Sequence, residues 1–214
     1  MTEPDVDLSE LEIDALTELV NIGVSRAAAS LRKMIGVQVV LSVPSIEIVS
    51  RDTAAQLIGE REDSTLVAIH QDFSGAFAGQ ALLIFPERSS LELVRAVTGG
   101  ELGPDELVEL EQEALAETGN IILNGCLATM ANMLERSLTM SLPEVLRGRG
   151  PELFQISRAQ PPASTVLFLY INFSVREHDI RGFIAMLMDL PSLTQLKLLV
   201  RNFIERVAGS DAFG

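Results

Sequence analysis

The sequence has no tryptophan, a single cysteine and few aromatic residues, and each shortage excludes a class of structure. Aromatic side chains make up 5% of the 214 residues, whereas hydrophobic residues make up 47%, so the core must be mainly aliphatic. One cysteine, Cys126, excludes an internal disulfide and a multi-cysteine metal site. Because Cys126 falls within an apolar helical pattern, we expect it to be a buried structural thiol.

Positive charge is also scarce, because 16 lysine and arginine residues stand against 30 acidic ones, which gives a net charge of −14. Binding to nucleic acid or to anionic lipid needs clustered basic side chains, so the composition argues against both partners. No apolar run approaches the roughly 20 residues of a membrane helix. The first ten residues are acidic and lack the apolar stretch of a secretory signal. We therefore expect a cytoplasmic protein without membrane insertion.

An internal repeat is the most informative feature of the chain. The stretch ELVNIGVSRAAASLRKMIGVQVVLSVP, residues 18–44, has a counterpart in ETGNIILNGCLATMANMLERSLTMSLP, residues 117–143. Both begin with Glu-x-x-Asn and end with Ser-x-Pro at the same spacing. Further along, the runs that open at Gly79 and Gly182 also resemble each other. A repeat of this length is too long for a solenoid unit and is typical of a duplicated domain. We predict a single domain, residues 1–214, made of half-repeats over about 1–100 and 101–214.

Hydrophobic periodicity predicts the same order of elements in both halves. The first half should open with a long helix that begins in a capping box of Ser9 and Glu12 and ends at Gly36. Its other predicted elements are a strand over 37–50, a short helix over 52–60, a hairpin over 65–73 and 79–86, and a helix over 87–99. The second half is predicted to contain helices over 105–135 and 192–207, and strands over 137–145, 164–175 and 180–190. The predicted fold class is α+β, with two pseudo-symmetric half-repeats whose long helices pack on a mostly antiparallel sheet.

A polar stripe runs along the long helix of each half. At about 100° per residue, Asp14, Glu18 and Asn21 lie within a narrow arc opposite the apolar stripe. The equivalent stripe of the second half consists of Glu113, Glu117 and Asn120. Each half is therefore expected to present one carboxylate and one carboxamide on the outward face of a rigid helix.

A lone Glu-x-x-Asn would indicate only a solvated helix surface. Its recurrence at one helix position, with proline at one spacing, favours a function, because asparagine is a poor residue for the middle of a helix. Neither side chain is a strong nucleophile, and no metal-binding cluster accompanies them. An amide can orient a water molecule and a carboxylate can pair with a basic side chain of a partner. Such placement supplies most of the rate in several phosphoryl-transfer systems.

At these positions the sequence resembles the CheC/CheX/FliY phosphatases of bacterial and archaeal chemotaxis, whose motif is Asp/Ser-x3-Glu-x2-Asn-x22-Pro. The first copy is complete, with Asp14, Glu18, Asn21 and Pro44. The second copy consists of Glu117, Asn120 and Pro143, with Glu113 where the family usually has serine or aspartate. Two intact copies resemble CheC rather than CheX. Since the chain ends after its second half, we expect no flagellar-switch domain of the FliY type.

The resemblance implies hydrolysis of the aspartyl phosphate on a CheY-type response regulator. By this resemblance, Asn21 and Asn120 would orient the attacking water, and the glutamate before each would pair with a lysine of the regulator. Asp14 and Glu113 would either support the helix face or only solvate it, and the two prolines would mark the strand beneath each helix. Mg²⁺ would be supplied by the regulator, so no cofactor or metal ligand of the chain's own is expected. The receptor deamidase CheD is a second partner that the resemblance suggests.

The two copies differ in their small residues. Glycine precedes the motif asparagine in the second copy, as Gly119, whereas valine does so in the first, as Val20. The first copy instead has Gly23, where the second has Ile122. If these glycines admit a partner closely, the two sites would be unequal. Two alternatives to catalysis stay open: a non-catalytic binding module or scaffold that regulates CheD, and a structural two-fold domain without an enzymatic partner.

Overall fold

The computed structural model describes residues 8–36, 38–61, 65–97, 104–156, 165–175 and 178–210. The first half of the chain contains α1 (Glu10–Ile35), β1 (Val39–Ser50), α2 (Arg51–Arg61), β2 (Leu66–Gly75), β3 (Gly79–Pro86) and α3 (Glu87–Val97). The second half contains α4 (Pro104–Met133), β4 (Leu138–Met140), β5 (Glu144–Gly148), α5 (Gly150–Ile156), β6 (Thr165–Val175), β7 (His178–Met188) and α6 (Leu190–Ser210). The elements follow the same order in both halves, as the repeat predicts.

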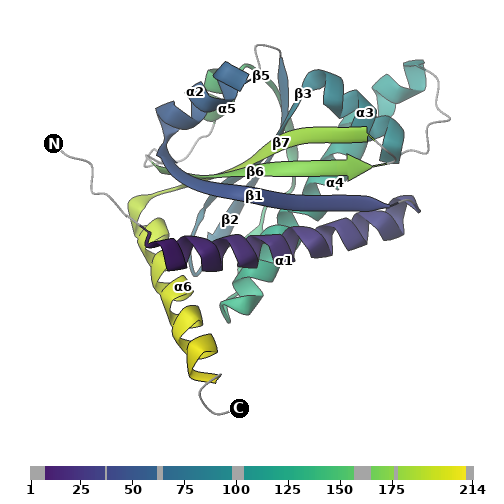
Figure 1. Cartoon of the computed structure of the whole chain (residues 1–214). Coiled ribbons are helices and arrows are strands. Elements are labelled where there is room, and N and C mark those ends of the chain that lie inside the picture. Colours follow the sequence, from purple (N-terminus) through teal and green to yellow (C-terminus); the bar gives the residue numbers. More distant parts are fainter. Residues whose placement is uncertain are drawn as a thin grey trace.

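The strands of the described chain form one antiparallel sheet in the order β1-β6-β7-β3-β2-β4, with β5 also paired to β2. The hairpins β2–β3 and β6–β7 meet at β3 and β7 in the centre of the sheet. The first strand of each half then crosses over, because β1 pairs with β6 while β4 and β5 pair with β2. The two halves therefore share one continuous sheet (Figure 1), and the predicted α+β class with an antiparallel sheet is confirmed.

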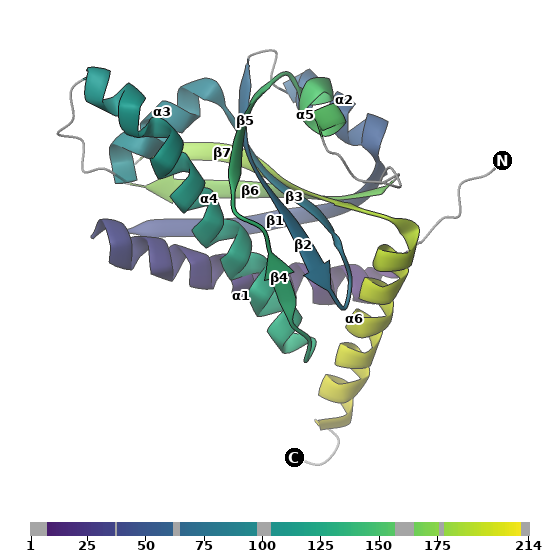
Figure 2. The ribbon, with the colours of Figure 1, turned by 180° about the vertical axis from the view of Figure 1, so that it is seen from behind.

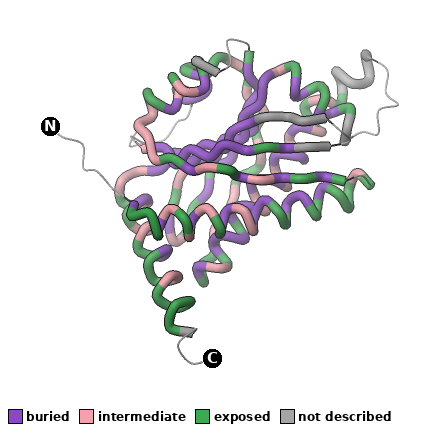
Figure 3. Tube along the Cα trace, in the orientation of Figure 1, coloured by how far each residue is buried: buried purple, intermediate pink, exposed green. Residues whose placement is uncertain are grey.

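Helices cover both faces of the sheet and enclose two cores (Figures 1 and 2). The larger core lies under α1 and α4 and is mostly aliphatic, with Leu19 and Leu123 fully buried in it. The smaller core lies under α2 and α5. In this core, the rings of Phe168, Tyr170 and Phe183 pack with centroids 5.1–5.8 Å apart. Figure 3 shows the buried strands between the layers and the exposed side of α1. No helix in the described ranges combines the length and apolarity needed to cross a membrane.

Both ends of α1 form as the local sequence predicts. The Glu12 N–H donates to the Ser9 hydroxyl at 3.3 Å, and the Ser9 N–H donates to the Glu12 carboxylate at 2.8 Å, which completes the capping box. At the other end, Gly36 adopts a left-handed conformation with a φ of 72°, which favours glycine.

Two features of the second half differ from the prediction. The strand predicted over 137–145 is interrupted at residues 141–143, so that β4 and β5 form separately. The short helix α5 corresponds in order to α2, but periodicity does not predict it, because seven residues are too few to show a helical period beside glycine and proline. The predicted end of α3 at Gly99 and the boundary between the half-repeats lie outside the described residues.

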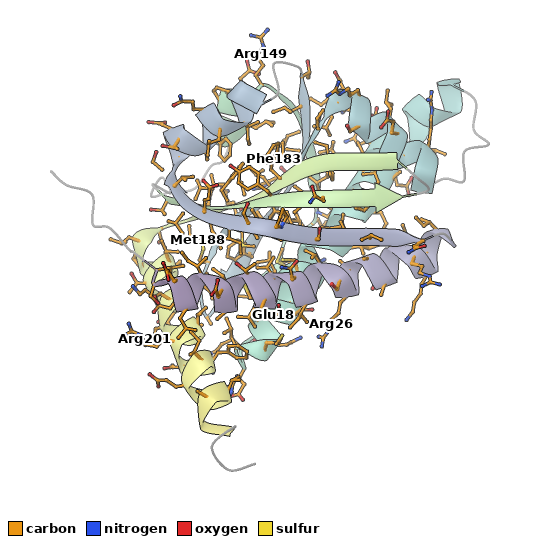
Figure 4. All side chains as sticks on the ribbon, in the orientation of Figure 1. Glu18, Arg26, Arg149, Phe183, Met188 and Arg201 are labelled. Atoms are coloured by element: carbon orange, nitrogen blue, oxygen red, sulfur yellow. The ribbon has the colours of Figure 1, made fainter. Side chains whose placement is uncertain are left out.

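Glu12 connects α1 to α6. Its buried carboxylate lies 3.7 Å from Lys197 Nζ and 3.4 Å from Arg201 Nε, and Figure 4 shows Arg201 on α6 beside the start of α1. Burial by itself raises the pKa of Glu12. The hydrogen bonds from Ser9 and the charges of Lys197 and Arg201 outweigh burial, so that the pKa lies below the 4.5 of an unperturbed glutamate.

Replacing Glu12 by glutamine should lower the free energy of unfolding by about 1 kcal/mol at pH 7, because the charge is lost while the amide can keep the capping geometry. A carboxylate with a lowered pKa stabilises the fold above its unfolded pKa, and this stabilisation is lost as pH falls through the folded pKa. In urea denaturation, the difference between the two proteins should therefore shrink below pH 4.5. A difference that is equal at pH 7 and at acidic pH would contradict this. Glu10→Gln, an exposed change in the same turn, is the control.

Candidate functional site

The proline of each motif lies at a one-residue bulge in the strand beneath its helix. Where β1 pairs with β6, the register shifts so that residues 43–44 face Ile171 alone. Where β2 pairs with β4 and β5, the extra residue falls within 142–143, which lie opposite Gln71. Proline lacks a backbone N–H, so a bulge can hold it without the loss of a ladder hydrogen bond. Pro44 thus lies within β1, and Pro143 lies at the break between β4 and β5.

Asn21 closes the first bulge with its side chain. The Val43 N–H donates to Asn21 Oδ1 at 2.9 Å, and Asn21 Nδ2 donates to the Val43 carbonyl at 3.1 Å. The contact forms because α1 lies along β1 (Figure 1), and it gives Val43 the partners that β6 does not supply at the bulge. The predicted outward stripe therefore holds for Asp14 and Glu18, which are exposed, but not for the half-buried Asn21 amide.

Asn120 is held by side chains instead of by backbone. Its Oδ1 accepts hydrogen bonds from Gln71 Nε2 at 3.1 Å and from Asn124 Nδ2 at 2.6 Å. Gln71 Nε2 also donates to the Ser141 carbonyl at 2.8 Å, beside the second bulge. In the described ranges, Asn120 Nδ2 donates to no protein acceptor. The amino end of this half-buried amide is therefore available to a ligand.

The carboxylates of both motifs are unpaired within the described part of the chain. Glu18 and Glu117 are exposed, each one helical turn before its asparagine, and neither takes part in an ion pair or side-chain hydrogen bond there. Figure 4 shows Glu18 on the stretch of α1 beneath β1. Asp14 and Glu113 are also exposed, on the same helices, and their side chains make no hydrogen bond or ion pair with a described residue. The structure thus brings one free carboxylate and one anchored amide together in each half.

Because the two asparagines have different hydrogen-bond partners, replacing each by alanine should change the free energy of unfolding by different amounts. Asn21→Ala should lower the free energy of unfolding by about 1–2 kcal/mol, because it leaves the N–H and carbonyl of Val43 without their partners. Asn120→Ala should cost less, because Gln71 keeps its bond to Ser141. Urea denaturation of the two variants measures this difference. A larger loss for Asn120→Ala would contradict the assigned contacts.

The motif glycines lie in the interior and do not admit a partner. A Cβ added at Gly119 would lie 2.5 Å from Ile69 Cγ2, and one added at Gly23 would lie 2.8 Å from Cys126 Cα. Both glycines and Val20 are buried. The condition under which these glycines would make the two sites unequal, close approach of a partner, is therefore not met: they let α4 pack on β2 and α1 pack on α4.

The predicted burial of Cys126 is confirmed. Its thiol lies in the larger core, and burial raises its pKa to about 12, so it stays protonated at neutral pH. Among the residues that the structure describes, no group of three or more His, Cys, Asp or Glu side chains is placed to hold a metal ion.

Two proteins of Bacillus subtilis resemble this chain in sequence. No protein-family model matches it. The flagellar motor switch phosphatase FliY of Bacillus subtilis (strain 168) is 26% identical over 151 residues, which are 68% of this chain and 39% of FliY. The CheY-P phosphatase CheC of the same organism is 26% identical over 144 residues, which are 64% of this chain and 67% of CheC. The match thus spans well under half the length of FliY.

Solved structures share the fold. The crystal structure of FliY from Thermotoga maritima has a TM-score of 0.73 at 16% identity, over 92% of this chain and 98% of that chain. The FliM middle domain from H. pylori has a TM-score of 0.56 at 10% identity, over 90% and 99% of the two chains. At these identities the structures show the fold alone. The sequence relatives, at 26% identity, support the CheC-type family of chemotaxis proteins, which the repeated motif resembles.

Proposed function

We propose that this protein hydrolyses the aspartyl phosphate of a phosphorylated CheY-type response regulator. One observation carries the proposal: each half presents an unpaired, exposed glutamate one helical turn before an anchored, half-buried asparagine. The name of the relative CheY-P phosphatase CheC supports the class of substrate. Such a substrate also implies that the protein acts in the cytoplasm.

The proposed reaction is attack of a water molecule on phosphorus, in line with the bond to the aspartate oxygen. The phosphorus–oxygen bond to the aspartate breaks, the aspartate leaves as a carboxylate, and inorganic phosphate is released. Little covalent chemistry is asked of the protein in such a reaction, because placement of the water provides most of the effect. Asn21 and Asn120 would place the water, and their rotation is restricted by the hydrogen bonds to Val43 and Gln71.

The glutamates would hold the regulator in register. Glu18 and Glu117 carry charges that no described residue of the chain neutralises, so each can pair with a lysine of the regulator. The net charge of −14 would also speed the approach of a basic surface. In this proposal Mg²⁺ is bound by the regulator. The protein positions the water through its asparagines and supplies negative charge through its glutamates.

A two-readout assay tests the proposal. A purified CheY-type regulator is phosphorylated with a small-molecule phosphodonor, the donor is removed, and both phosphate release and binding to the protein are followed. One protein per ten regulators should shorten the lifetime of the phosphoryl group by at least about tenfold. Binding of the regulator, or of CheD, without faster phosphate release would contradict hydrolysis. It would favour the non-catalytic binding module, a function that the fold also permits.

A further inference from the structure

Gln71 is a buried polar residue that neither motif contains. It lies on β2 with 0% of its side chain exposed, and its Nε2 donates both to Asn120 Oδ1 and to the Ser141 carbonyl. It thereby connects the amide on α4 with the bulge between β4 and β5. Its position in the sheet is opposite residues 142–143, directly at the second bulge.

The hydrogen bond to the Ser141 carbonyl stabilises the fold, but it uses only the amino end of the Gln71 amide. The Gln71 Oε1 atom is buried and has no hydrogen-bond partner in the described ranges. An unpaired buried acceptor costs about 1–3 kcal/mol, and an apolar side chain would avoid that cost. The first bulge shows this alternative, because the residue opposite it is Ile171, which is buried and apolar.

We infer that Gln71 is a positioning residue for Asn120, an inference that rests on the proposed function. Two donors, Gln71 Nε2 and Asn124 Nδ2, bind the Asn120 oxygen. Because a carboxamide is planar, holding its oxygen on one side directs its amino group to the other. Gln71 therefore fixes which end of Asn120 meets the attacking water. At the first site, the backbone of Val43 binds both ends of the Asn21 amide. The two sites therefore differ in how their asparagine side chains are held.

The test uses proteins in which a single site remains. Gln71→Met keeps the approximate length of the side chain and removes the donor. In the Asn21→Ala background, where only the second site remains, we expect kcat for a phosphorylated CheY-type regulator to fall about tenfold while KM changes less than twofold. In the Asn120→Ala background, kcat should change less than twofold. Gln80→Met is the matched control, because Gln80 is also buried with an unpaired oxygen but donates to Asp72.

A second readout does not depend on turnover. The side-chain NH₂ signals of Asn120 in a ¹⁵N NMR spectrum can be assigned by their absence in Asn120→Ala. These signals should shift in Gln71→Met and stay in place in Gln80→Met. Unchanged Asn120 signals, or equal losses of kcat in both backgrounds, would overturn the positioning role. If the folded wild-type protein releases phosphate no faster than the regulator alone, the proposed function itself is contradicted, whereas the NMR readout still tests the positioning role of Gln71.

Discussion

Replacing both Asn21 and Asn120 by alanine is expected to lower the rate of regulator dephosphorylation by at least about 100-fold, because alanine cannot place the attacking water. The exposed carboxylates of Glu18 and Glu117 remain in this variant, so binding of the regulator should weaken much less than turnover. Phosphate release under saturating regulator measures the effect. Asn132→Ala, a change at an exposed asparagine of α4 outside the site, is the matched control.

The double variant has to be shown to fold, because Asn21 also completes the bulge of β1. Near-ultraviolet circular dichroism and the urea midpoint provide this check. Asn21→Asp gives a second version, since a carboxylate can still accept from the Val43 N–H but cannot donate to the carbonyl. If the double variant folds and turns over at the wild-type rate, the two amides take no part in the reaction.

Gly23→Ala should lower the free energy of unfolding by about 3 kcal/mol, which is a large effect for one methyl group. An added Cβ would lie 2.8 Å from Cys126 Cα and 2.9 Å from its carbonyl oxygen, and this backbone of α4 cannot rotate away. Gly125 makes the reciprocal contact, where a Cβ would lie 2.8 Å from Ala27 Cβ. The crossing of α1 and α4 thus depends on small residues of both helices.

Urea denaturation measures this effect, and Gly59→Ala is its control. Gly59 is an exposed residue of α2 where an added Cβ meets nothing within 4 Å. In a helix, alanine is favoured over glycine, so this variant should gain about 0.5–1 kcal/mol. Two changes of the same sign and size would show that the crossing tolerates a methyl group. The crossing of α1 and α4 would then not require glycine at position 23.

The parts of the fold that the sequence predicts are those with local signals. The ends of α1 follow from Ser9, Glu12 and Gly36, because a cap depends on residues within a turn or two of itself. The doubled motif predicts two equivalent halves for the same reason, since it can be found by aligning the chain with itself. The break between β4 and β5 was missed, although its proline was noted, because a bulge depends on the partner strand.

The contacts that distinguish the two sites had no such signal. Asn21 meets Val43, and Asn120 meets Gln71, only through the placement of helices on the sheet. The crossing of β1 to β6 joins residues more than 100 positions apart, and no periodicity records it. The only sequence signal for Gln71 is that it is a polar residue within an apolar strand pattern. This signal becomes informative only once the burial of Gln71 is known. The sequence does not decide whether the glycines admit a partner or pack in the core, because periodicity does not show which neighbour a small residue accommodates.

Turnover by a catalytic amount of protein measures the proposed hydrolysis most directly. Phosphorylated CheY-type regulator in tenfold excess is mixed with the protein, and inorganic phosphate is counted against time. We expect each protein molecule to release several phosphates, faster than the regulator alone releases them. With the Asn21→Ala/Asn120→Ala variant, the rate should return to that of the regulator alone. Phosphate release at the regulator's own rate, with a folded protein that binds the regulator, would contradict it.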